Sequence, residues 1–543
     1  MTTALPSTTT PSLTNRNKDV NSPSKDGLHV DGNHNADDLL QDLGYTAQFT
    51  RNRSTLQVAF MAFVLASIPY GMATTIYYPL IGGGPVNIIW GWVGVSLIVS
   101  CVALSLGEIT SVFPTAGGYL NAGVYYQSFM LSPPQWRRIA SWICGWFYLV
   151  GNITIIVAVN FATSTFIISC INMFSTDEDT TLISGDAYQV FLIYLAVTLI
   201  CTSISTFGNR WLPILDTVAI FGTFISLFAI VITILVLAKN GRRDAKWVFT
   251  HFEASSGWPD GWSFCIGLLH AAYATSATGM ITSMCEEVRR PEIQVPRAMV
   301  ATVFINLLAG VMILVPVCFI LPDIQALIAL PWAQPIPYIF KSATGSAGVS
   351  MALLAPVLLL GVLCGTGCCT VASRVIWAFA RDGAVPGAKH WTKISPALHI
   401  PLNAMILSTT IQVLLGLIYF GSTAAFSAFS GVGVICLTAS YATPITISLL
   451  RGREEVSRGC FYFGFFGAVC NVVAIGEHLF LSCDFASNFA YLPFPNSSLV
   501  TFGYSPFLYA NVSTSDPFHS QLWPSRLCCR RSTFGFLVLV LGP

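Results

Sequence analysis

The sequence predicts an all-α polytopic membrane protein, and three observations carry the prediction. Hydrophobic residues make up 54% of the 543 residues, and the mean hydropathy is +0.67. Charged residues make up only 9%, against roughly 25% in soluble domains. Apolar stretches long enough to cross a bilayer recur along the chain. A surface so poor in charge excludes a soluble globular protein, and a net charge of +1 gives no reason to expect nucleic acid as a partner.

Eleven segments are expected to cross the membrane, because each contains roughly 20 mostly apolar residues. Segments 1 to 5 cover 56–80, 88–106, 142–170, 187–206 and 212–238. Segments 6 to 10 cover 262–284, 299–321, 349–380, 402–420 and 424–450. Segment 11, at 461–483, is weaker, because Glu477 and His478 interrupt it. Residues 322–347 contain three prolines in their middle and are expected to form a loop with a short surface helix.

The chain divides into a polar tail, a transporter core and an atypical end. Residues 1–50 are expected to be a disordered cytoplasmic tail, since aromatic residues are absent up to position 44. Residues 51–455 form the ten-helix core, with 456–483 as an eleventh helix and 484–543 as a tail that lacks a recognisable span. Most of the 16 cysteines lie in apolar runs and are interpreted as buried hydrophobic residues, so no metal or cofactor is expected.

The distribution of Lys and Arg predicts the orientation in the membrane. With the N-terminus inside, the loops on the cytoplasmic side hold 14 Lys and Arg residues, and those on the outer side hold five. Positively charged loops stay in the cytoplasm, so the N-terminus is expected to be cytoplasmic. The loop after segment 5, which contains Arg242 and Arg243, is an exception to this rule.

Two segments are interrupted at matching depth. Segment 1 contains Ser67–Gly71, where Pro69 removes a backbone donor, and segment 6 contains the small and hydroxylated run Tyr273–Gly279. Backbone groups freed in hydrocarbon cost several kcal/mol each unless a substrate, an ion or water satisfies them. Interruptions five helices apart indicate inverted repeats, about 56–238 and 262–450, with an anionic group held at the midplane. Packing between helices is the alternative explanation for both patterns.

Three motifs lie at the predicted cytoplasmic ends of segments 2, 6 and 8. They are Gly107–Ile109 with Phe113–Gly118, Cys285–Pro291 with Val295–Ala298, and Ser373–Arg374 with Ala380–Gly383, Pro386 and Ile400–Ala404. Together they resemble the amino acid–polyamine–organocation permeases, most closely the fungal amino acid/choline branch that includes GABA and choline permeases. The resemblance spans about residues 50–455. It departs from the family at a small insertion, Tyr119–Gly123, and at the missing twelfth span.

Charged residues in these motifs are suited to an intracellular gate. Glu108, Glu286, Arg374 and Arg381 place opposite charges at one membrane face, where they can pair when the gate closes and part when it opens. Static ion pairs or solvated loop charges are the alternative.

Three polar residues inside the spans are candidates for coupling or binding. His270 precedes the break of segment 6 and either senses pH or packs through a hydrogen bond. Asp216 lies one turn into segment 5 and either carries a proton or caps the helix. Asn152 of segment 3 either contacts the substrate or bonds across helices.

The substrate site is expected at the midplane between segments 1, 3, 6 and 8. Hydroxyl and backbone N–H groups there suit a carboxylate, and aromatic rings suit a quaternary ammonium. These groups fit a zwitterion, GABA or choline, whereas the absence of an obvious acid in mid-membrane argues against a polyamine. The predicted residues are Ser67, Pro69, Tyr70, Gly71, Asn152, Tyr273, Thr275, Ser276, Thr278, Gly279 and Thr366.

These observations predict a secondary transporter rather than a pump or an enzyme. The chain has no P-loop, no HExxH zinc motif and no cluster of catalytic residues at depth. The resemblance implies a plasma-membrane permease that moves an amino acid, GABA or choline together with protons. A nutrient sensor that keeps the permease fold without transport is the alternative.

Overall fold

The structure, a computed structural model, describes residues 63–65, 68–114, 123–175, 182–208, 211–237, 242–288, 290–330, 334–395, 398, 400–421 and 423–490. Several sequence predictions fall outside these residues: the N-terminal tail, Ser67, the insertion up to position 122 and the tail beyond 490. The side chain of Glu286 is likewise outside the described part.

The N-terminal half of the described chain consists of helices. Segment 1 is divided into α3 (Ile68–Thr75) and α4 (Tyr77–Gly82), and segment 2 is a π-helical turn, η1 (Asn87–Gly91), continued by α5 (Trp92–Val112). The following helices are α6 (Gly123–Leu131), α7 (Arg137–Asn172), α8 (Ala187–Phe207) and α9 (Leu212–Leu237).

The C-terminal half continues in the same way. Segment 6 comprises α11 (Asp260–Gly267), α12 (Leu269–Thr275) and the 3₁₀-helix η2 (Ser276–Glu287). Segments 7 to 11 are α13 (Pro291–Phe319), α16 (Ala347–Arg381), α18 (Leu402–Gly416) with η4 (Leu417–Phe420), α19 (Thr423–Leu450) and α20 (Gly464–Ala490). Short connecting helices are α10 (Ala245–Thr250), α14 (Ile324–Ile328), α15 (Ile336–Thr344), α17 (Ala388–Trp391) and η5 (Val456–Arg458).

The all-α membrane fold class is confirmed. Within the described residues there is no β-strand, and ten helices are long and apolar enough to cross a membrane. Segment 1 is not among these ten; its described helices are α3 and α4. Segment 2 continues to Val112, six residues beyond the predicted end. The helix can include Glu108 in its last turns because Arg453 pairs with this carboxylate.

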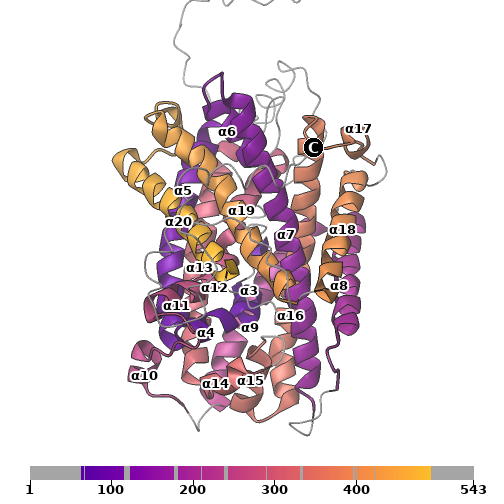
Figure 1. Ribbon diagram of the computed structural model, residues 1–543, viewed down its shortest axis with the longest axis vertical. Helices are drawn as coiled ribbons and strands as arrows, with labels where there is room; N and C mark the ends of the chain where they lie inside the picture. Colours follow the sequence, from indigo (N-terminus) through magenta and orange to yellow (C-terminus); the bar gives the residue numbers. More distant parts are fainter. Residues whose placement is uncertain are drawn as a thin grey trace, which may run out of the picture.

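The helices stand side by side along the long axis of the molecule, and the connecting helices gather at its two ends (Figure 1). One end, called here the α6 end, carries α6 and α17; the opposite end, called the α15 end, carries α10, α14 and α15. The helix α7 packs extensively against α16 and α19, and α5 packs against α13 and α20. The short helices α3 and α12 contact each other within this frame.

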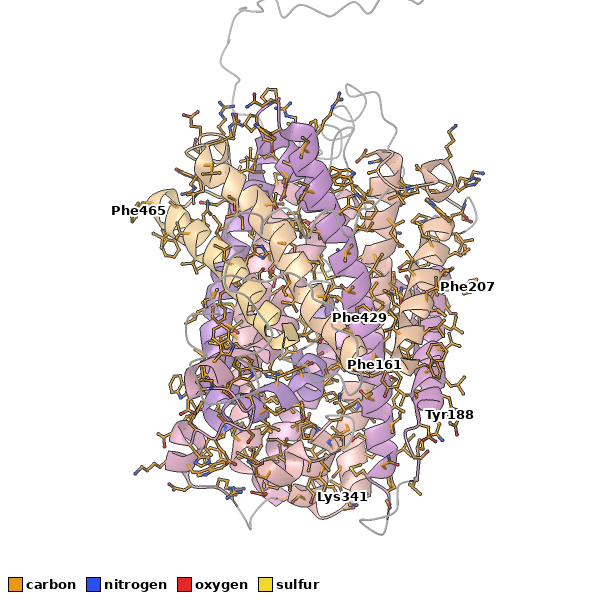
Figure 2. All side chains as sticks on the ribbon, in the orientation of Figure 1. Phe161, Tyr188, Phe207, Lys341, Phe429 and Phe465 are labelled. Atoms are coloured by element: carbon orange, nitrogen blue, oxygen red, sulfur yellow. The ribbon has the colours of Figure 1, made fainter. Side chains whose placement is uncertain are left out.

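Large apolar side chains cover the outside of the bundle. Phe207 is 75% exposed and Phe465 is 86% exposed, and both lie at the outer edge of the molecule in Figure 2. Many further Leu, Ile and Phe side chains on α8 and α9 are exposed as well. Water would not tolerate so large an apolar surface, whereas lipid chains do.

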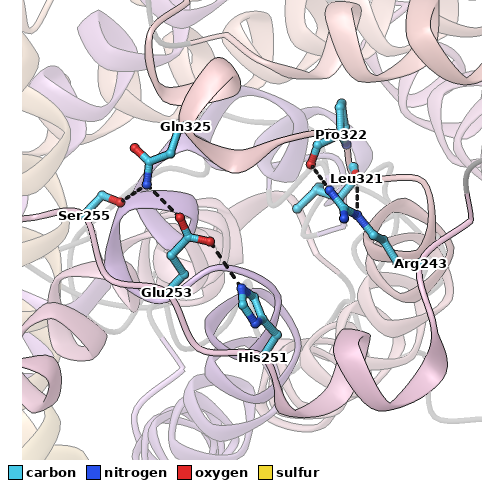
Figure 3. Close-up of polar contacts among 7 residues, drawn as sticks. All are labelled: Arg243, His251, Glu253, Ser255, Leu321, Pro322 and Gln325. Atoms are coloured by element: carbon cyan, nitrogen blue, oxygen red, sulfur yellow. Dashed lines mark hydrogen bonds and ion pairs between the residues drawn. The ribbon is translucent and has the colours of Figure 1, made fainter.

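Two loops are tied together at the α15 end (Figure 3). Arg243, one of the basic residues that break the charge rule, donates hydrogen bonds to the carbonyls of Leu321 and Pro322 at 3.0 and 3.1 Å. Gln325 donates to a carboxylate oxygen of Glu253 at 2.7 Å, and this bond lowers the pKa of Glu253. The cation of Arg243 therefore has a structural role, which explains its position in a predicted outer loop.

Close contact between α5 and α13 depends on a glycine. Gly310 of α13 faces the indole of Trp92, which is fully buried and donates to the carbonyl of Leu307 at 3.3 Å. A Cβ atom at position 310 would lie 2.2 Å from the indole ring. The ring fits only because position 310 has no side chain.

We predict that Gly310→Ala destabilises the protein by about 1–3 kcal/mol, because the indole must shift in a packed interior. Gly222→Ala is the matched control, since Gly222 also lies inside a helix but has no atom within 4 Å of an added Cβ. The control should be neutral or gain up to about 1 kcal/mol from helix propensity. Thermal unfolding of the purified protein in detergent measures both, and equal stability of the two variants would contradict the packing argument.

Candidate functional site

A backbone carbonyl of segment 1 accepts a hydrogen bond from a neighbouring helix. Pro69 of α3 has no N–H, so it cannot donate to the carbonyl of Leu65 four residues earlier. That carbonyl instead accepts a hydrogen bond of 3.4 Å from the thiol of Cys364 on α16. Within α3, the carbonyl of Gly71 accepts one from Thr75 at 2.7 Å.

Tyr70 connects segments 1, 3 and 8. Its hydroxyl donates to the carbonyl of Val159 on α7 at 2.7 Å and lies 2.7 Å from the hydroxyl oxygen of Thr163. Its ring lies against Gly361 of α16, where an added Cβ would approach it to 2.5 Å. The predicted pocket between these segments is therefore filled by Tyr70 in this conformation.

The break of segment 6 is a change of helix type at Ser276. The 3₁₀-helix η2 extends over 12 residues, whereas runs longer than three or four are uncommon and often mark hinges. Two tyrosines donate to its carbonyls: Tyr441 of α19 to Ser276 and Tyr148 of α7 to Met280, each at 3.2 Å. Gly279 admits the Tyr441 ring, because a Cβ there would lie 2.5 Å from it.

The hydroxyl groups predicted to bind the substrate instead donate hydrogen bonds to backbone carbonyls of segment 6 itself. Thr275 donates to the carbonyl of Ala271 at 2.7 Å, and Ser276 donates to that of Tyr273 at 2.9 Å. Thr278 donates to the carbonyl of Thr275 at 2.7 Å. All three residues are buried. Their hydroxyl oxygens thus keep acceptor lone pairs but have no donor to offer a carboxylate in this arrangement.

A hydrogen bond joins the two interrupted segments. The Nδ1 atom of His270 on α12 lies 2.8 Å from the Oγ1 of Thr75 on α3. Because the Thr75 hydroxyl already donates to Gly71, the imidazole must donate through Nδ1–H, which defines the neutral tautomer. The ring also lies 5.8 Å from that of Trp92, centre to centre. His270 therefore connects the breaks of segments 1 and 6.

Two of the residues predicted to bind the substrate carry buried polar atoms without a partner in the described part of the chain, as does the Nε2 atom of the predicted coupling residue His270. The hydroxyl of Tyr273 has no hydrogen bond, and neither has the Oδ1 of Asn152, whose Nδ2 donates to Tyr148 at 2.7 Å. Thr366 behaves differently, because it donates to Val362 within α16 and lies beside Cys201 of α8. The unpartnered atoms of Tyr273 and Asn152 are available to a ligand.

A small cavity lies on the other side of segment 6, and sequence analysis missed it. It has a volume of about 20 Å³ and is bounded by α5, α12, η2, α19 and α20. Thr275, Ser276 and Thr278 line it together with Tyr441 and Glu477. The expectation that mid-membrane has no acid is therefore corrected: α20 packs on α5 and α19 and turns Glu477 into the protein. The charge that weakened segment 11 in the sequence was the only signal of this position.

The gate residue Glu108 is paired, with a partner that we did not predict. Its Oε2 lies 2.5 Å from Nη2 of Arg453, in the loop before α20, and its Oε1 accepts from the backbone N–H of Phe463 at 2.8 Å. The side chains of Glu108 and Arg453 are 1% and 6% exposed. We expected Arg374 or Arg381 to pair with Glu108, but the structure pairs Glu108 with Arg453.

Three further predicted gate and coupling residues lie on α16 and α9. Arg381 ends α16 and places its guanidinium over Trp377, 4.5 Å from the ring centre. Arg374 is buried in the same helix, and Asp216 is buried on α9, which packs against α13 and α16. Within the described residues, no group of His, Cys, Asp and Glu side chains is arranged to hold a metal ion.

Asp382 forms a second polar contact at the α6 end. It follows α16 and accepts a hydrogen bond of 2.6 Å from the hydroxyl of Tyr125 on α6. Burial raises the pKa of Asp382 to about 6, against the opposing effects of the Tyr125 bond and of Arg381. This carboxyl group therefore changes its charge near neutral pH.

Comparison with known proteins identifies the class. Residues 54–511 match the amino acid permease family, so the chain belongs to this family and is an integral membrane permease. A choline transporter of Saccharomyces cerevisiae is 29% identical over 421 residues, which cover 77% of this chain and 73% of the transporter.

Two further relatives differ in what their names say they carry. A polyamine transporter of Saccharomyces cerevisiae is 33% identical over 420 residues, which cover 76% of this chain and 66% of that protein. An amino-acid permease of Arabidopsis thaliana is 28% identical over 462 residues, which cover 83% of this chain and 88% of the relative.

We predict that Arg453→Gln destabilises the protein by about 3–5 kcal/mol, because it leaves the buried carboxylate of Glu108 without a cation. The double variant Glu108→Gln with Arg453→Gln should lose less than the single variant. Arg458→Gln is the control, since Arg458 pairs with Glu455 at 3.4 Å while 75% exposed and should matter by less than about 1 kcal/mol. Equal thermal stability of Arg453→Gln and the control would contradict the pairing.

We also predict a pH-dependent contribution from Asp382. A carboxyl group whose pKa is raised in the folded state stabilises the fold most when protonated, and this contribution is lost as the pH rises from about 4 to about 6. Asp382→Asn should therefore raise the unfolding temperature near pH 7.5 and change it little near pH 4. Thermal unfolding at the two pH values tests this, and an effect of the same size at both would overturn it.

Proposed function

We propose that this permease is a secondary active transporter that imports amino acids or related nitrogenous compounds, such as GABA or choline, together with protons. In this proposal the protein lies in the plasma membrane with its N-terminus in the cytoplasm and transports by alternating access. The observation that carries it is the meeting of two interrupted segments, joined by His270 and Thr75. The unpartnered polar atoms of Tyr273 and Asn152 support it, since they are buried at depth.

The geometry supports a substrate site around Tyr273. Tyr70 and Tyr78 of segment 1 and Cys364 of segment 8 lie close enough to Tyr273 to interact with it electrostatically. An unpaired hydroxyl in a protein interior costs about 1–3 kcal/mol, which a polar ligand would recover. Aromatic rings beside it offer cation–π contact to an ammonium group. A carboxylate would be bound once Ser276 and Thr278 release their helix carbonyls and turn their hydroxyl hydrogens toward it.

Alternating access would use the breaks as hinges. The carbonyls of Ser276 and Met280 are held by the hydroxyls of Tyr441 and Tyr148, which can follow a moving helix at a cost of about 1 kcal/mol per bond. The buried pair of Glu108 with Arg453 would hold the α6 end closed and part when it opens. We further propose that 51–455 is the transporter core, built from two inverted repeats.

The relatives widen the set of substrates to be tested. A choline transporter and a polyamine transporter are both similar to this chain, and both names refer to cationic nitrogen compounds. Our argument against a polyamine assumed that no acid lies near segment 6, and the position of Glu477 removes that assumption. Labelled GABA, choline and spermidine should therefore all be tried.

The test is uptake into fungal cells that lack their own carriers for these compounds, at acid and neutral external pH. We predict saturable uptake of at least one compound, stronger at acid pH. Protein that reaches the plasma membrane but transports none of them would favour the sensor hypothesis instead.

Tyr273→Phe should raise the KM for the transported compound about tenfold, because it removes one hydrogen bond to the ligand. Tyr188→Phe is the control: Tyr188 lies on α8, is 55% exposed and should behave like the wild type. An unchanged KM in Tyr273→Phe would remove this residue from the proposed site.

A further inference from the structure

We propose that Glu477 of α20 carries the coupling proton, at a site on the far side of segment 6 from Tyr70; the inference rests on the proposed proton-coupled transport. Its carboxylate lines the cavity beside Thr275, Ser276 and Thr278. The Oε2 atom is buried and has no hydrogen-bond partner in the described part of the chain. Glu108 is also a buried carboxylate, but it differs from Glu477 because it forms an ion pair with Arg453.

The cavity offers hydrogen-bond acceptors but no donor. Every hydroxyl group in its lining donates to backbone: Thr275 to Ala271, Ser276 to Tyr273, Thr278 to Thr275, Thr438 to Ile435 and Tyr441 to Ser276. The remaining lining residues are apolar apart from Glu477. An ionised carboxylate is poorly accommodated among acceptors, whereas a protonated carboxyl group can donate its O–H to one of them. The lining therefore favours a proton on Glu477.

Cations of the protein do not reach this site within the described residues. Among residues with described side chains, the ionisable ones on the elements packed around Glu477 are Cys101 and Glu108 on α5, Cys436 and Tyr441 on α19, Asp260 and Cys265 on α11, His270 and Tyr273 on α12, Cys285 on η2, and Cys470 and His478 on α20. Arg453 lies against Gly467 and pairs with Glu108. Gly467 precedes Glu477 by ten residues, or about 15 Å along the helix. His478 is turned toward Thr438, at 3.5 Å.

The size of the cavity favours a proton over the substrate. A volume of about 20 Å³ accommodates one water molecule, since one such molecule needs roughly 10–15 Å³ on this measure. An amino acid or a polyamine does not fit. A proton taken from the water on one side of the membrane can bind to Oε2 and leave to the other side, and no further reactant is needed.

The location couples the proton to segment 6. When Glu477 is protonated, the hydroxyls of Ser276 and Thr278 remain on their helix carbonyls, as in the structure. When it is ionised, it attracts hydroxyl hydrogens, directly or through one water molecule, and weakens those bonds. The same hydroxyls belong to the proposed substrate site, so the charge of Glu477 changes how segment 6 binds and bends.

The test uses the full-length protein in proteoliposomes, with an imposed pH gradient and the membrane potential clamped at zero. Symport of one proton accumulates the transported compound about tenfold per pH unit, because one unit is worth about 1.4 kcal/mol. We expect this in the wild type, whereas Glu477→Gln should exchange labelled for unlabelled compound but lose accumulation. Glu455→Gln, a carboxylate at the surface of the α6 end, is the matched control and should accumulate normally.

Each outcome separates the inference from the proposed function. Glu477→Gln that accumulates like the wild type would overturn the inference alone, and loss of exchange in this variant would assign Glu477 to substrate binding instead. Wild-type transport without proton coupling would overturn both. Should Glu477→Gln fail to fold, infrared titration of the wild type and Glu477→Asp decides the matter: a protonated carboxyl band that shifts in the variant supports the proton site, and an unshifted band contradicts it.

Discussion

The structure depends on backbone carbonyls that must find donors where there is no water. Segments 1 and 6 interrupt their helices inside the bundle, and each orphaned carbonyl there costs several kcal/mol. The thiol of Cys364 reaches Leu65, and the hydroxyls of Tyr148 and Tyr441 reach η2. These donors come from α16, α7 and α19, so the packing of three long helices around the breaks follows from the need to satisfy them.

Different interactions hold the centre and the α6 end, and their strengths decide which is easier to open. The bonds from Tyr148 and Tyr441 are between neutral groups and contribute about 1 kcal/mol each, so η2 can exchange them cheaply wherever another donor replaces the tyrosine hydroxyl. The pair of Glu108 with Arg453 is buried, and separating the two charges without hydration costs several kcal/mol. Rearrangement at the centre is therefore easy, whereas opening at the α6 end needs water or a new partner for the charges.

The hydroxyl groups of segment 6 are central to the mechanism that we propose for this permease. Membership of the amino acid permease family rests on residues 54–511, which include both interruptions and Glu477. Thr275, Ser276 and Thr278 line the cavity beside Glu477, and in our proposal they also belong to the substrate site near Tyr273. A single row of Ser and Thr residues can thus respond to a carboxylate ligand on one side and to a proton on the other.

The sequence by itself determined the membrane class, the boundaries of most spans and the position of the break in segment 6, because hydropathy and a run of small residues act locally. Only the tertiary structure decided which residues the buried charged side chains contact. Arg453 lies 345 residues from Glu108, and no local pattern predicts that α20 brings them together. It likewise decided that Glu477 faces inward, since the packing of α20 on α5 and α19, rather than its own hydropathy, selects which face meets lipid.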